Sequence, residues 1–501
     1  MTILDYLEKT ASAHMERVAV DDGNIRLTWR ELLKLSKRMG HTFSKRTKPG
    51  NPIVIMSDKS VLTLAAMFGT VYAGCFYVIA DPSQPAVRLQ EIFKVLNPQL
   101  VVTSNENKSI CDRLKYKNDV ILFKDAMLEE VNEKRLLELR NKIRETDLLY
   151  GIFTSGSTGT PKGIVVSHKA VIDFISHFTE IFGFTEHDII GNQAPFDFDV
   201  SVKDIYTSVM TGAELVLIPK KMFSVPTMLL DYLCDKKVNT LIWAVSALVI
   251  VSSLKGLEYK IPQDIKRIMF SGEVMPAKQL RLWQKAFPGA SFVNLYGPTE
   301  ITCNCTYFKI DRSYNDYEKI PIGKAFPGRE VFLLDEDGKR IINEGEIGEI
   351  CVAGESLSEG YYNNKAETDA RFVYNPDENI RYYKTGDLGS YGSSGELYFS
   401  GRKDFQVKHM GHRIELEEIE HVFNRIKGIE RSVCLMDYKR NQITAFYCGE
   451  AESAEVRKQA KKMLPMYMVP RKIIKTDVMP LTKNGKTNRG YFKTLLEGDD
   501  I

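Results

Sequence analysis

The stretch Thr154-Ser155-Gly156-Ser157-Thr158-Gly159-Thr160-Pro161-Lys162-Gly163 decides how the rest of the chain is interpreted. It lies between the apolar runs 148–153 and 164–166, which predicts two strands joined by a small polar loop. Glycines let the backbone approach an anion closely, hydroxyl groups can donate hydrogen bonds, and Lys162 adds a positive charge. The loop therefore has the chemistry of a polyphosphate-binding site.

Two other interpretations account for less of this loop. It does not follow the Walker pattern, because no Gly-Lys-Ser/Thr closes it and a strand, not a helix, is expected to follow. A flexible hairpin loop would account for the Gly/Ser/Thr composition alone. The order of the residues, however, goes beyond composition.

The ordered string resembles the signature of the adenylate-forming (AMP-binding, acyl-activating) superfamily, which couples a carboxylic acid to ATP. Further strings resemble the later signatures of the same superfamily and occur in its order: Asn294-Leu295-Tyr296-Gly297-Pro298-Thr299-Glu300, Tyr383-Lys384-Thr385-Gly386-Asp387, Gly401-Arg402-Lys403-Asp404, and Pro480-Leu481-Thr482-Lys483-Asn484-Gly485-Lys486-Thr487-Asn488-Arg489. The resemblance covers nearly the whole chain. Around 199–206 and 404–406 it is most similar to D-alanine:carrier-protein ligases, followed by the amino-acid adenylation domains of nonribosomal peptide synthetases.

The fold class follows from alternating helical and apolar strand patterns, which favour an α/β architecture with largely parallel sheets. Strands are expected at 52–56, 100–102, 214–218, 240–244 and 267–270, and helices from 27 and 88 onward and over 170–182 and 225–234. Segment 127–144 is charged and expected to be partly helical. Short β-segments follow residue 344. The resemblance implies a large N-terminal adenylation domain, 1–402, and a small mobile α+β lid domain, 403–501.

Bulk composition excludes several classes of protein. The 501 residues include 68 Lys+Arg and 65 Asp+Glu, and a net charge of +3 argues against nucleic acid as the main partner. Eight cysteines without Cys-x-x-Cys pairs suggest reduced thiols and a cytoplasmic location. No signal-peptide pattern opens the sequence. The uncharged stretch 61–80 is long enough for a membrane span, but its pattern favours a buried helix, a glycine cap and a buried strand.

The residue chemistry of the later strings agrees with nucleotide binding. An exposed Tyr296 ring could stack on a purine, and Glu300 could hold Mg²⁺ against phosphate oxygens. By resemblance, Asp387 binds ribose, Arg402 helps to hold the nucleotide, Asp404 is the hinge between domains, and Lys486 is the catalytic lysine. The resemblance implies ATP and Mg²⁺ as cofactors, with Glu300 on the metal and the nucleotide bound by Thr154, Ser155, Thr158, Lys162, Gly272, Glu273, Asn294, Leu295, Tyr296, Gly297, Pro298, Thr299, Asp387, Arg402 and Lys486.

The amino-acid pocket also comes from the resemblance, with Asp199 at the position that pairs with a substrate ammonium. The pocket positions are Asp199, Val200, Lys203, Trp243, Met269, Ser271, Leu295, Cys303 and Asn304. Lys203 departs from an alanine-specific pocket. If a helix begins just after Asp199, Asp199 and Lys203 share one face, and they could simply pair with each other. Asp204 or Glu300 could also pair with Lys203, or Lys203 could bind a substrate carboxylate or carboxamide.

The implied function is ATP-dependent activation of an amino acid as aminoacyl-AMP, followed by thioester transfer to a phosphopantetheine arm. The acceptor is expected to be a separate acyl or peptidyl carrier protein. A coenzyme A ligase for a small carboxylic acid is the main alternative, and an inactive nucleotide-binding paralogue is a further one. Nucleic acid and membrane insertion are not expected.

Overall fold

The computed structural model describes residues 1–156, 161–481 and 487–497. The chain divides into two compact units. Unit 1 comprises residues 1–82, 96–152 and 163–403, and unit 2 comprises residues 83–95, 153–162 and 404–501. The expected α/β class is confirmed, and the boundary between residues 402 and 403 stays a prediction.

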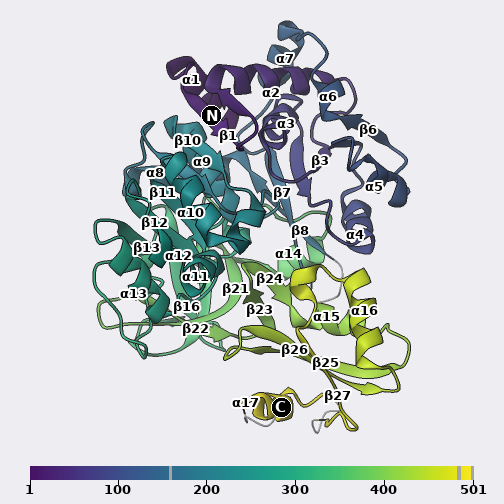
Figure 1. Ribbon diagram of the computed structural model, residues 1–501, viewed down its shortest axis with the longest axis vertical. Coiled ribbons are helices and arrows are strands. Elements are labelled where there is room, and N and C mark those ends of the chain that lie inside the picture. Colours follow the sequence, from purple (N-terminus) through teal and green to yellow (C-terminus); the bar gives the residue numbers. More distant parts are fainter. Residues whose placement is uncertain (157–160, 482–486, 498–501) are drawn as a thin grey trace. The chain divides into compact units, whose positions relative to one another are not determined.

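A mixed sheet of unit 1, called sheet A, has the strand order β15-β14-β13-β12-β11-β9-β10-β1-β2 in the described residues (Figure 1). Neighbouring strands from β13 to β1 are parallel, and β15, β14 and β2 add antiparallel edges. The strands are β1 Val18–Asp21, β2 Arg26–Thr28, β9 Ile189–Asn192, β10 Glu214–Leu217, β11 Thr240–Ala244, β12 Arg267–Ser271, β13 Ser291–Tyr296, β14 Thr306–Ile310 and β15 Lys324–Ala325.

A second mixed sheet, called sheet B, has the order β19-β8-β7-β4-β3-β5-β6. Its strands are β3 Pro52–Met56, β4 Phe76–Ala80, β5 Leu100–Thr103, β6 Asp119–Leu122, β7 Leu148–Thr154, β8 Lys162–Ser167 and β19 Gly360–Tyr361. Parallel strands buried on both faces have continuous apolar sequences, as β3 and β4 do. The two strands expected around the polar loop are β7 and β8.

The β-rich region expected after residue 344 forms an antiparallel sheet, called sheet C, which begins earlier in the chain. Its order is β17-β16-β18-β21-β20, with β22 also paired to β21. The strands are β16 Arg329–Leu334, β17 Arg340–Ile341, β18 Gly348–Gly354, β20 Phe372–Asn375, β21 Ile380–Tyr391 and β22 Leu397–Arg402. Strand β21 places Asp387 beside Arg402 of β22.

Two apolar cores lie on the opposite faces of sheet A. One contains residues of sheets A, B and C together with helices α1 Ile3–Ala13, α2 Trp29–Ser44, α3 Val61–Tyr72, α8 His168–Phe182 and α9 Val200–Thr211. The other lies under α10 Pro226–Asp235, α11 Val245–Ser253 and α13 Ala277–Ala286. Along β11, Ile242 joins the first core and Trp243 the second, as the alternation of strand side chains requires.

Shorter elements complete unit 1. They are α5 Lys108–Arg113, α6 Phe123–Ala126, α7 Glu133–Arg140, η1 Lys220–Ser224, α12 Gly256–Tyr259, η2 Thr299–Ile301 and α14 Lys365–Arg371. The helix expected within 127–144 is the eight-residue α7, which begins where the side chain of Asn132 accepts a hydrogen bond from the Arg135 amide.

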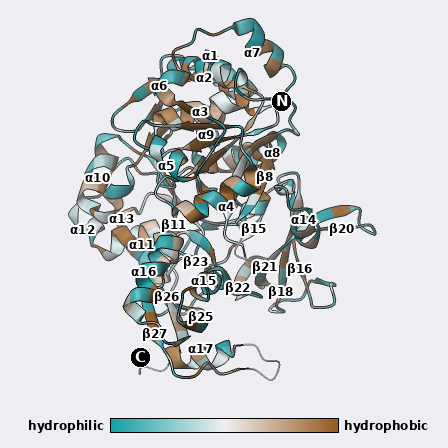
Figure 2. Cartoon of the chain, turned by 90° about the vertical axis from the view of Figure 1, so that its right-hand side faces the viewer, coloured by the Kyte–Doolittle hydropathy of each residue, from teal (hydrophilic) through white to brown (hydrophobic). Residues whose placement is uncertain are grey.

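The uncharged stretch 61–80 is a buried helix and a buried strand, as its pattern predicted. Helix α3 has an apolar sequence, coloured mainly brown to white in Figure 2, and all of its residues except the half-buried Leu62 are buried. Gly74, with φ +71°, makes the turn into β4. Among the helices of the described residues, we find none whose length and hydropathy would suit a membrane span.

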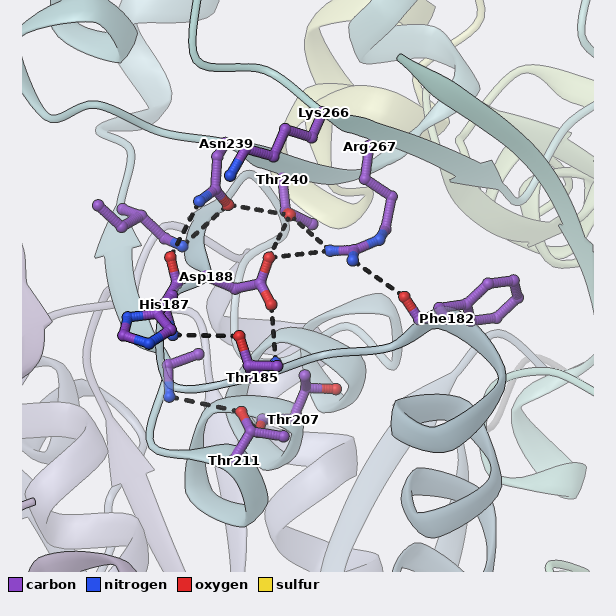
Figure 3. A network of polar contacts seen from close by, with 12 residues as sticks. Phe182, Thr185, His187, Asp188, Thr207, Thr211, Asn239, Thr240, Lys266 and Arg267 are labelled. Atoms are coloured by element: carbon purple, nitrogen blue, oxygen red, sulfur yellow. Dashed lines mark hydrogen bonds and ion pairs between the residues drawn. The ribbon is translucent and has the colours of Figure 1, made fainter. Parts of the chain in front are cut away.

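A polar network holds sheet A at the amino ends of its strands (Figure 3). Arg267 at the start of β12 donates to Asp188 Oδ1 at 3.0 Å, to Thr240 Oγ1 at 2.9 Å and to the Phe182 carbonyl at 2.9 Å. Asn239 donates to the His187 carbonyl at 3.1 Å. These bonds fix β9, β11 and β12 relative to one another, so the opposite ends of the same strands are held in register.

Unit 2 contains the hairpin β23 Gln406–His409 and β24 His412–Glu415, and a sheet of β25 Ile429–Asp437, β26 Gln442–Gly449 and β27 Lys472–Lys475. Its helices are α4 Ala86–Leu96, which extends one residue into unit 1, α15 Leu416–Phe423, α16 Ser453–Met463, η3 Met466–Met468 and α17 Arg489–Glu497. Arg88 of α4 forms a buried ion pair with Glu418 of α15. Ser155 Oγ donates to the Arg413 carbonyl at 2.9 Å and accepts from the Glu415 amide at 3.0 Å.

Candidate active site

Four parallel strands of sheet A end close to one another in the order β13-β12-β11-β9. Their last residues are Tyr296, Ser271, Ala244 and Asn192. In open α/β sheets, ligands bind beyond the carboxyl ends of the strands. Residues expected to bind nucleotide and substrate follow these ends, so the topology brings together motifs from separate parts of the chain.

Asp199 immediately precedes α9 and is buried. Its Oδ2 accepts a hydrogen bond of 2.6 Å from Thr299 Oγ1, which lies in η2 after β13. The bond therefore orients a carboxylate at the N-terminus of a helix, where the helix dipole also favours negative charge. Helix α9 begins at Val200, as predicted.

The loop after β13 is tightly packed and strained. Thr302 and Cys303 have φ values of 54° and 81°, which non-glycine residues adopt only at an energetic cost. A Cβ at Gly297 would lie 2.5 Å from Asn304 Cα, so only glycine fits beside this backbone. Thr302 Oγ1 donates to the Ser356 carbonyl at 2.7 Å and helps to hold the strained segment.

Lys203 lies one helical turn after Asp199 and is completely buried, with 0% of its surface exposed. Its Nζ donates to Asn304 Oδ1 at 2.8 Å and to Ser271 Oγ at 3.3 Å. One alternative from the sequence was a direct pair of Lys203 with Asp199, Asp204 or Glu300. No such pair forms in the described part of the chain, so this alternative is wrong. Burial raises the pKa of the neighbouring Cys303 thiol to about 12.

Seven of the predicted pocket residues are divided between the two faces of sheet A. Met269, Leu295 and Cys303 belong to the core on the α9 side, where Lys203 bonds to Ser271 and Asn304. Trp243 belongs to the opposite core, stacks edge-on against Phe223 and donates to the Gly191 carbonyl at 2.7 Å. Trp243 is thus separated from the Lys203 cluster, and its role in substrate binding stays a prediction. Val200 is buried at the start of α9.

A second polar cluster joins sheets A and C. Tyr296 Oη donates to Asp387 Oδ2 at 2.6 Å, and Arg402 donates to Asp387 Oδ1. Burial and the adjacent Asp387 raise the pKa of Tyr296 well above its usual value, so the phenol stays protonated. Tyr296 is buried, which corrects the expectation that its ring is exposed. Glu300 is also buried and accepts a hydrogen bond of 2.8 Å from Tyr361 Oη.

The remaining predicted residues are spread over the turns and unit 2. Gly272 makes the turn after β12 with φ +97°, followed by Glu273, and Asn294 Nδ2 donates to the Pro321 carbonyl at 2.8 Å. Thr154, Ser155, Lys162 and Asp404 belong to unit 2. Pro298 precedes η2. Thr158 and Lys486 lie outside the described residues.

The sequence interpretation missed a buried network behind α9. Lys59 Nζ donates to Asn192 Oδ1 at 3.0 Å, and Asn192 Nδ2 donates to Asp204 Oδ2 at 2.6 Å. Burial lowers the pKa of Lys59 to about 7 and raises the pKa of Asp204 to about 7. The position of Lys59 just after the apolar strand β3 could have indicated a buried lysine. Its partner Asn192, however, is 133 residues away and could not be identified from the sequence.

The chain matches the family model described as "AMP-binding enzyme" over residues 7–362, and it belongs to this family. It is 32% identical over 518 residues to the D-alanine–D-alanyl carrier protein ligase of Bacillus licheniformis, covering 98% of this chain and 99% of that protein. It is 31% identical to a part of surfactin synthase subunit 1 of Bacillus subtilis, covering 97% of this chain and 14% of that protein.

A solved structure shares the fold. The adenylation domain AlmE of Vibrio cholerae, in complex with glycyl-adenosine-5'-phosphate, superposes with a TM-score of 0.86, covering 99% of this chain and 98% of AlmE at 21% sequence identity. At 21% sequence identity, this comparison supports a shared fold only. The predicted resemblance to the AMP-binding superfamily, based on ordered strings of sequence, is confirmed.

Proposed function

We propose that this protein is an ATP-dependent ligase that activates an amino acid and transfers it to a carrier protein. The observation that carries the proposal is the buried Asp199 carboxylate, oriented by Thr299 beside the carboxyl ends of sheet A. An oriented carboxylate can bind an ammonium group through charge-assisted hydrogen bonds, and every amino acid carries such a group. The ligases among the relatives act on an amino acid and a carrier protein.

The reaction has two steps. A carboxylate oxygen of the amino acid attacks the α-phosphorus of ATP and displaces pyrophosphate, which gives aminoacyl-AMP. The sulfur of a phosphopantetheine thiol on a separate carrier protein then attacks the carbonyl carbon, the thiol loses its proton, and AMP leaves. Positive charge near the α-phosphate stabilises the first transition state, and we assign this role to Lys486.

The nucleotide fits the second polar cluster. The carboxylate of Asp387 accepts two hydrogen bonds from Tyr296 and Arg402, and a carboxylate has room for about four. It can therefore also accept the ribose hydroxyls. Tyr296 and Arg402 hold this carboxylate in place.

Glu300 would hold Mg²⁺, which would neutralise phosphate charge in the bound nucleotide. The described residues contain no group of three or more His, Cys, Asp or Glu side chains arranged as a metal site. Magnesium commonly binds through one or two carboxylates and the phosphates of a nucleotide, so a single buried glutamate fits this requirement. Tyr361 orients Glu300 by its hydrogen bond.

We further assign Asp404 as the hinge between a domain of residues 1–402 and a lid of residues 403–501. Thr154, Ser155, Thr158 and Lys162 would bind the phosphates. The hydroxyl of Ser155 is shared between Arg413 and Glu415 in unit 2, so phosphate binding by this group requires these bonds to exchange.

Exchange of radioactive pyrophosphate into ATP, over a panel of D- and L-amino acids, tests the first step. We expect at least one amino acid to support exchange, and Lys486→Ala to abolish it while the protein stays folded. Mass spectrometry of a phosphopantetheine-bearing carrier protein tests the second step. Acyl transfer to coenzyme A in preference to any carrier protein would instead establish the coenzyme A ligase.

A further inference from the structure

Lys203 forms no ion pair with a carboxylate in the described part of the chain. Its ammonium group is buried and bonds to two neutral oxygens, and among the described residues no carboxylate lies within ion-pair distance of it. The Cys303 thiol is neutral at neutral pH because burial raises its pKa to about 12. Burying a cation without a partner is costly, so a counter-charge is expected from a ligand.

Asp204 does not serve as this anion. It follows Lys203 directly in α9, so its side chain projects from a different side of the helix. Its Oδ2 accepts from Asn192, and burial raises its pKa to about 7. Asp204 attracts Lys203 across the helix, but it makes no hydrogen bond to it.

Two side chains that bond to Lys203, those of Asn304 and Ser271, retain hydrogen-bond donors. Asn304 is 1% exposed, and because its oxygen faces the Lys203 cation, its amide nitrogen faces away. That nitrogen has no acceptor within the described part of the chain. The Ser271 hydroxyl accepts from Lys203, and its own hydrogen has no acceptor there either. An ammonium group has three hydrogens: on Lys203 two bond to Asn304 and Ser271, and the Cys303 sulfur, a weak acceptor, is the other neighbour.

We infer that Lys203, Asn304 and Ser271 bind the side-chain carboxylate of an acidic amino acid, which is the substrate of the ligase. An ionised carboxylate only accepts hydrogen bonds, so it can satisfy all three groups and supply the missing negative charge. The inference rests on the proposed function, in which Asp199 binds the substrate ammonium.

The spacing of the two charges agrees with this substrate class. Asp199 and Lys203 are four residues apart at the start of α9, which brings side chains to one face with Cβ atoms roughly 5–6 Å apart. Aspartate and glutamate carry an ammonium and a second carboxylate separated by only a few bonds of about 1.5 Å each. One molecule can therefore bridge both residues.

Neutral amino acids fit this cluster less well. Alanine would leave the Lys203 charge and the Asn304 amide without an acceptor. Asparagine and glutamine bring an acceptor oxygen, but their amide nitrogen would face the remaining donors of Asn304 and Ser271, and an unpaired buried donor lowers binding.

The first experiment measures pyrophosphate exchange by the wild-type protein with the D and L forms of aspartate, glutamate, asparagine, glutamine and alanine, and with glycine. We expect kcat/KM for an acidic amino acid to exceed that for alanine by roughly 100-fold or more. A carboxamide or apolar amino acid as the best substrate would overturn the inference.

The second experiment compares Lys203→Met, which removes the charge at similar volume, with Lys203→Arg, which keeps it. We expect the ratio of kcat/KM for the acidic amino acid over alanine to fall at least tenfold in Lys203→Met and less in Lys203→Arg. Lys236→Met is the matched control, because Lys236 pairs with Asp21 at 2.7 Å and should leave the ratio unchanged. A ratio that is equal in all three variants and the wild type would contradict a specificity role for Lys203.

The outcomes separate the two proposals. If no amino acid supports exchange by the folded protein, the proposed function fails. If a neutral amino acid supports it best, only the acidic substrate fails. If Lys203→Met does not fold, the wild-type panel decides.

Discussion

Thr299 Oγ1 lies 2.6 Å from Asp199 Oδ2, across 100 residues of sequence. The bond joins the loop after β13 to the start of α9. Through this contact the strained segment of residues 297–304 fixes the orientation of the carboxylate that we propose to bind the substrate ammonium.

Thr299→Val removes this hydroxyl at nearly constant volume. We expect the KM for the amino acid to rise about tenfold, because a hydrogen bond to a charged group contributes about 1.5 kcal/mol or more. Steady-state pyrophosphate exchange measures this KM. Thr207→Val is the matched control: Thr207 is equally buried in α9, and its hydroxyl has no partner in the described residues, so its replacement should leave the KM unaltered. Equal KM values for both variants would contradict the orienting role of Thr299.

Gly297→Ala should unfold the loop after β13. The added Cβ would meet backbone atoms of Asn304 and Cys303 at 2.5 and 2.8 Å, which cannot move as a flexible side chain could. We expect a loss of roughly 2 kcal/mol in the free energy of unfolding, measured by urea denaturation. In Gly289→Ala, where nothing lies within 4 Å of the new Cβ, the change should stay below about 0.5 kcal/mol. An equally small effect at Gly297 would show that the packing at this position is looser than described.

His168 makes stability depend on pH. Its Nδ1 accepts a hydrogen bond of 3.2 Å from the Ile3 amide at the start of α1, and burial lowers its pKa to about 4. Between pH 6.5 and 4 the unfolded state therefore binds more protons than the folded state, so stability is lost as the pH falls through this range. The loss is up to about 3 kcal/mol.

His168→Asn should flatten this part of the stability curve, because asparagine offers an oxygen acceptor that does not titrate. Urea denaturation at several pH values between 4 and 7.5 gives the comparison. The exposed His187, replaced in the same way, is the control. Parallel curves for His168→Asn and the wild type would rule out the buried imidazole as the source of the pH dependence.

Arg489, three residues after Lys486 in the sequence, is held by two elements of unit 2. Its guanidinium donates to Glu420 Oε2 at 2.7 Å and to the Cys434 carbonyl at 2.8 Å. The described residues on either side of Lys486 are paired with each other, since Asn488 donates to the Pro480 carbonyl at 2.8 Å and Leu481 bridges to Thr487. Arg489 thus ties the described residues 480–481 and 487–489 to α15 and β25.

Arg489→Met should lower pyrophosphate exchange at least tenfold and impair thioester formation from preformed aminoacyl-AMP much less. A displaced Lys486 would slow adenylate formation more than thioester formation, whereas a general loss of folding would slow both steps equally. Arg457→Met removes a comparable arginine of unit 2 that donates to two backbone carbonyls, and it should affect both steps little. A proportional loss of both steps in Arg489→Met would reduce its role to stability.

Local elements were well predicted where they depend on local chemistry. Strands 52–56 and 240–244 match β3 and β11, because β-branched and apolar runs bounded by polar residues fit only a buried strand. The helix starting after Asp199 was also predicted. Helix α7 is shorter than the charged segment suggested, since charged sequence alone does not mark the end of a helix.

Side-chain environment was predicted less well. Tyr296 was expected to be exposed, but β21 of sheet C brings Asp387 against its hydroxyl from 91 residues away. Trp243 and Met269 are both predicted pocket residues, and the structure places them in different cores, because β11 and β12 pair Trp243 with Phe270 and Met269 faces the other side. The strand pairing that decides this cannot be derived from either strand alone.

The sequence by itself determined the family, the α/β class and the identity of the polar groups, because ordered motifs and hydrophobic periodicity are local properties of the chain. Only the tertiary structure decided which of these groups meet. Lys203 could have paired with Asp199, four residues away, yet it bonds to Asn304, 101 residues away, and to Ser271. The physical reason is that burial forces polar groups to find partners wherever the packed sheets and helices place them, and those positions are set by non-local contacts.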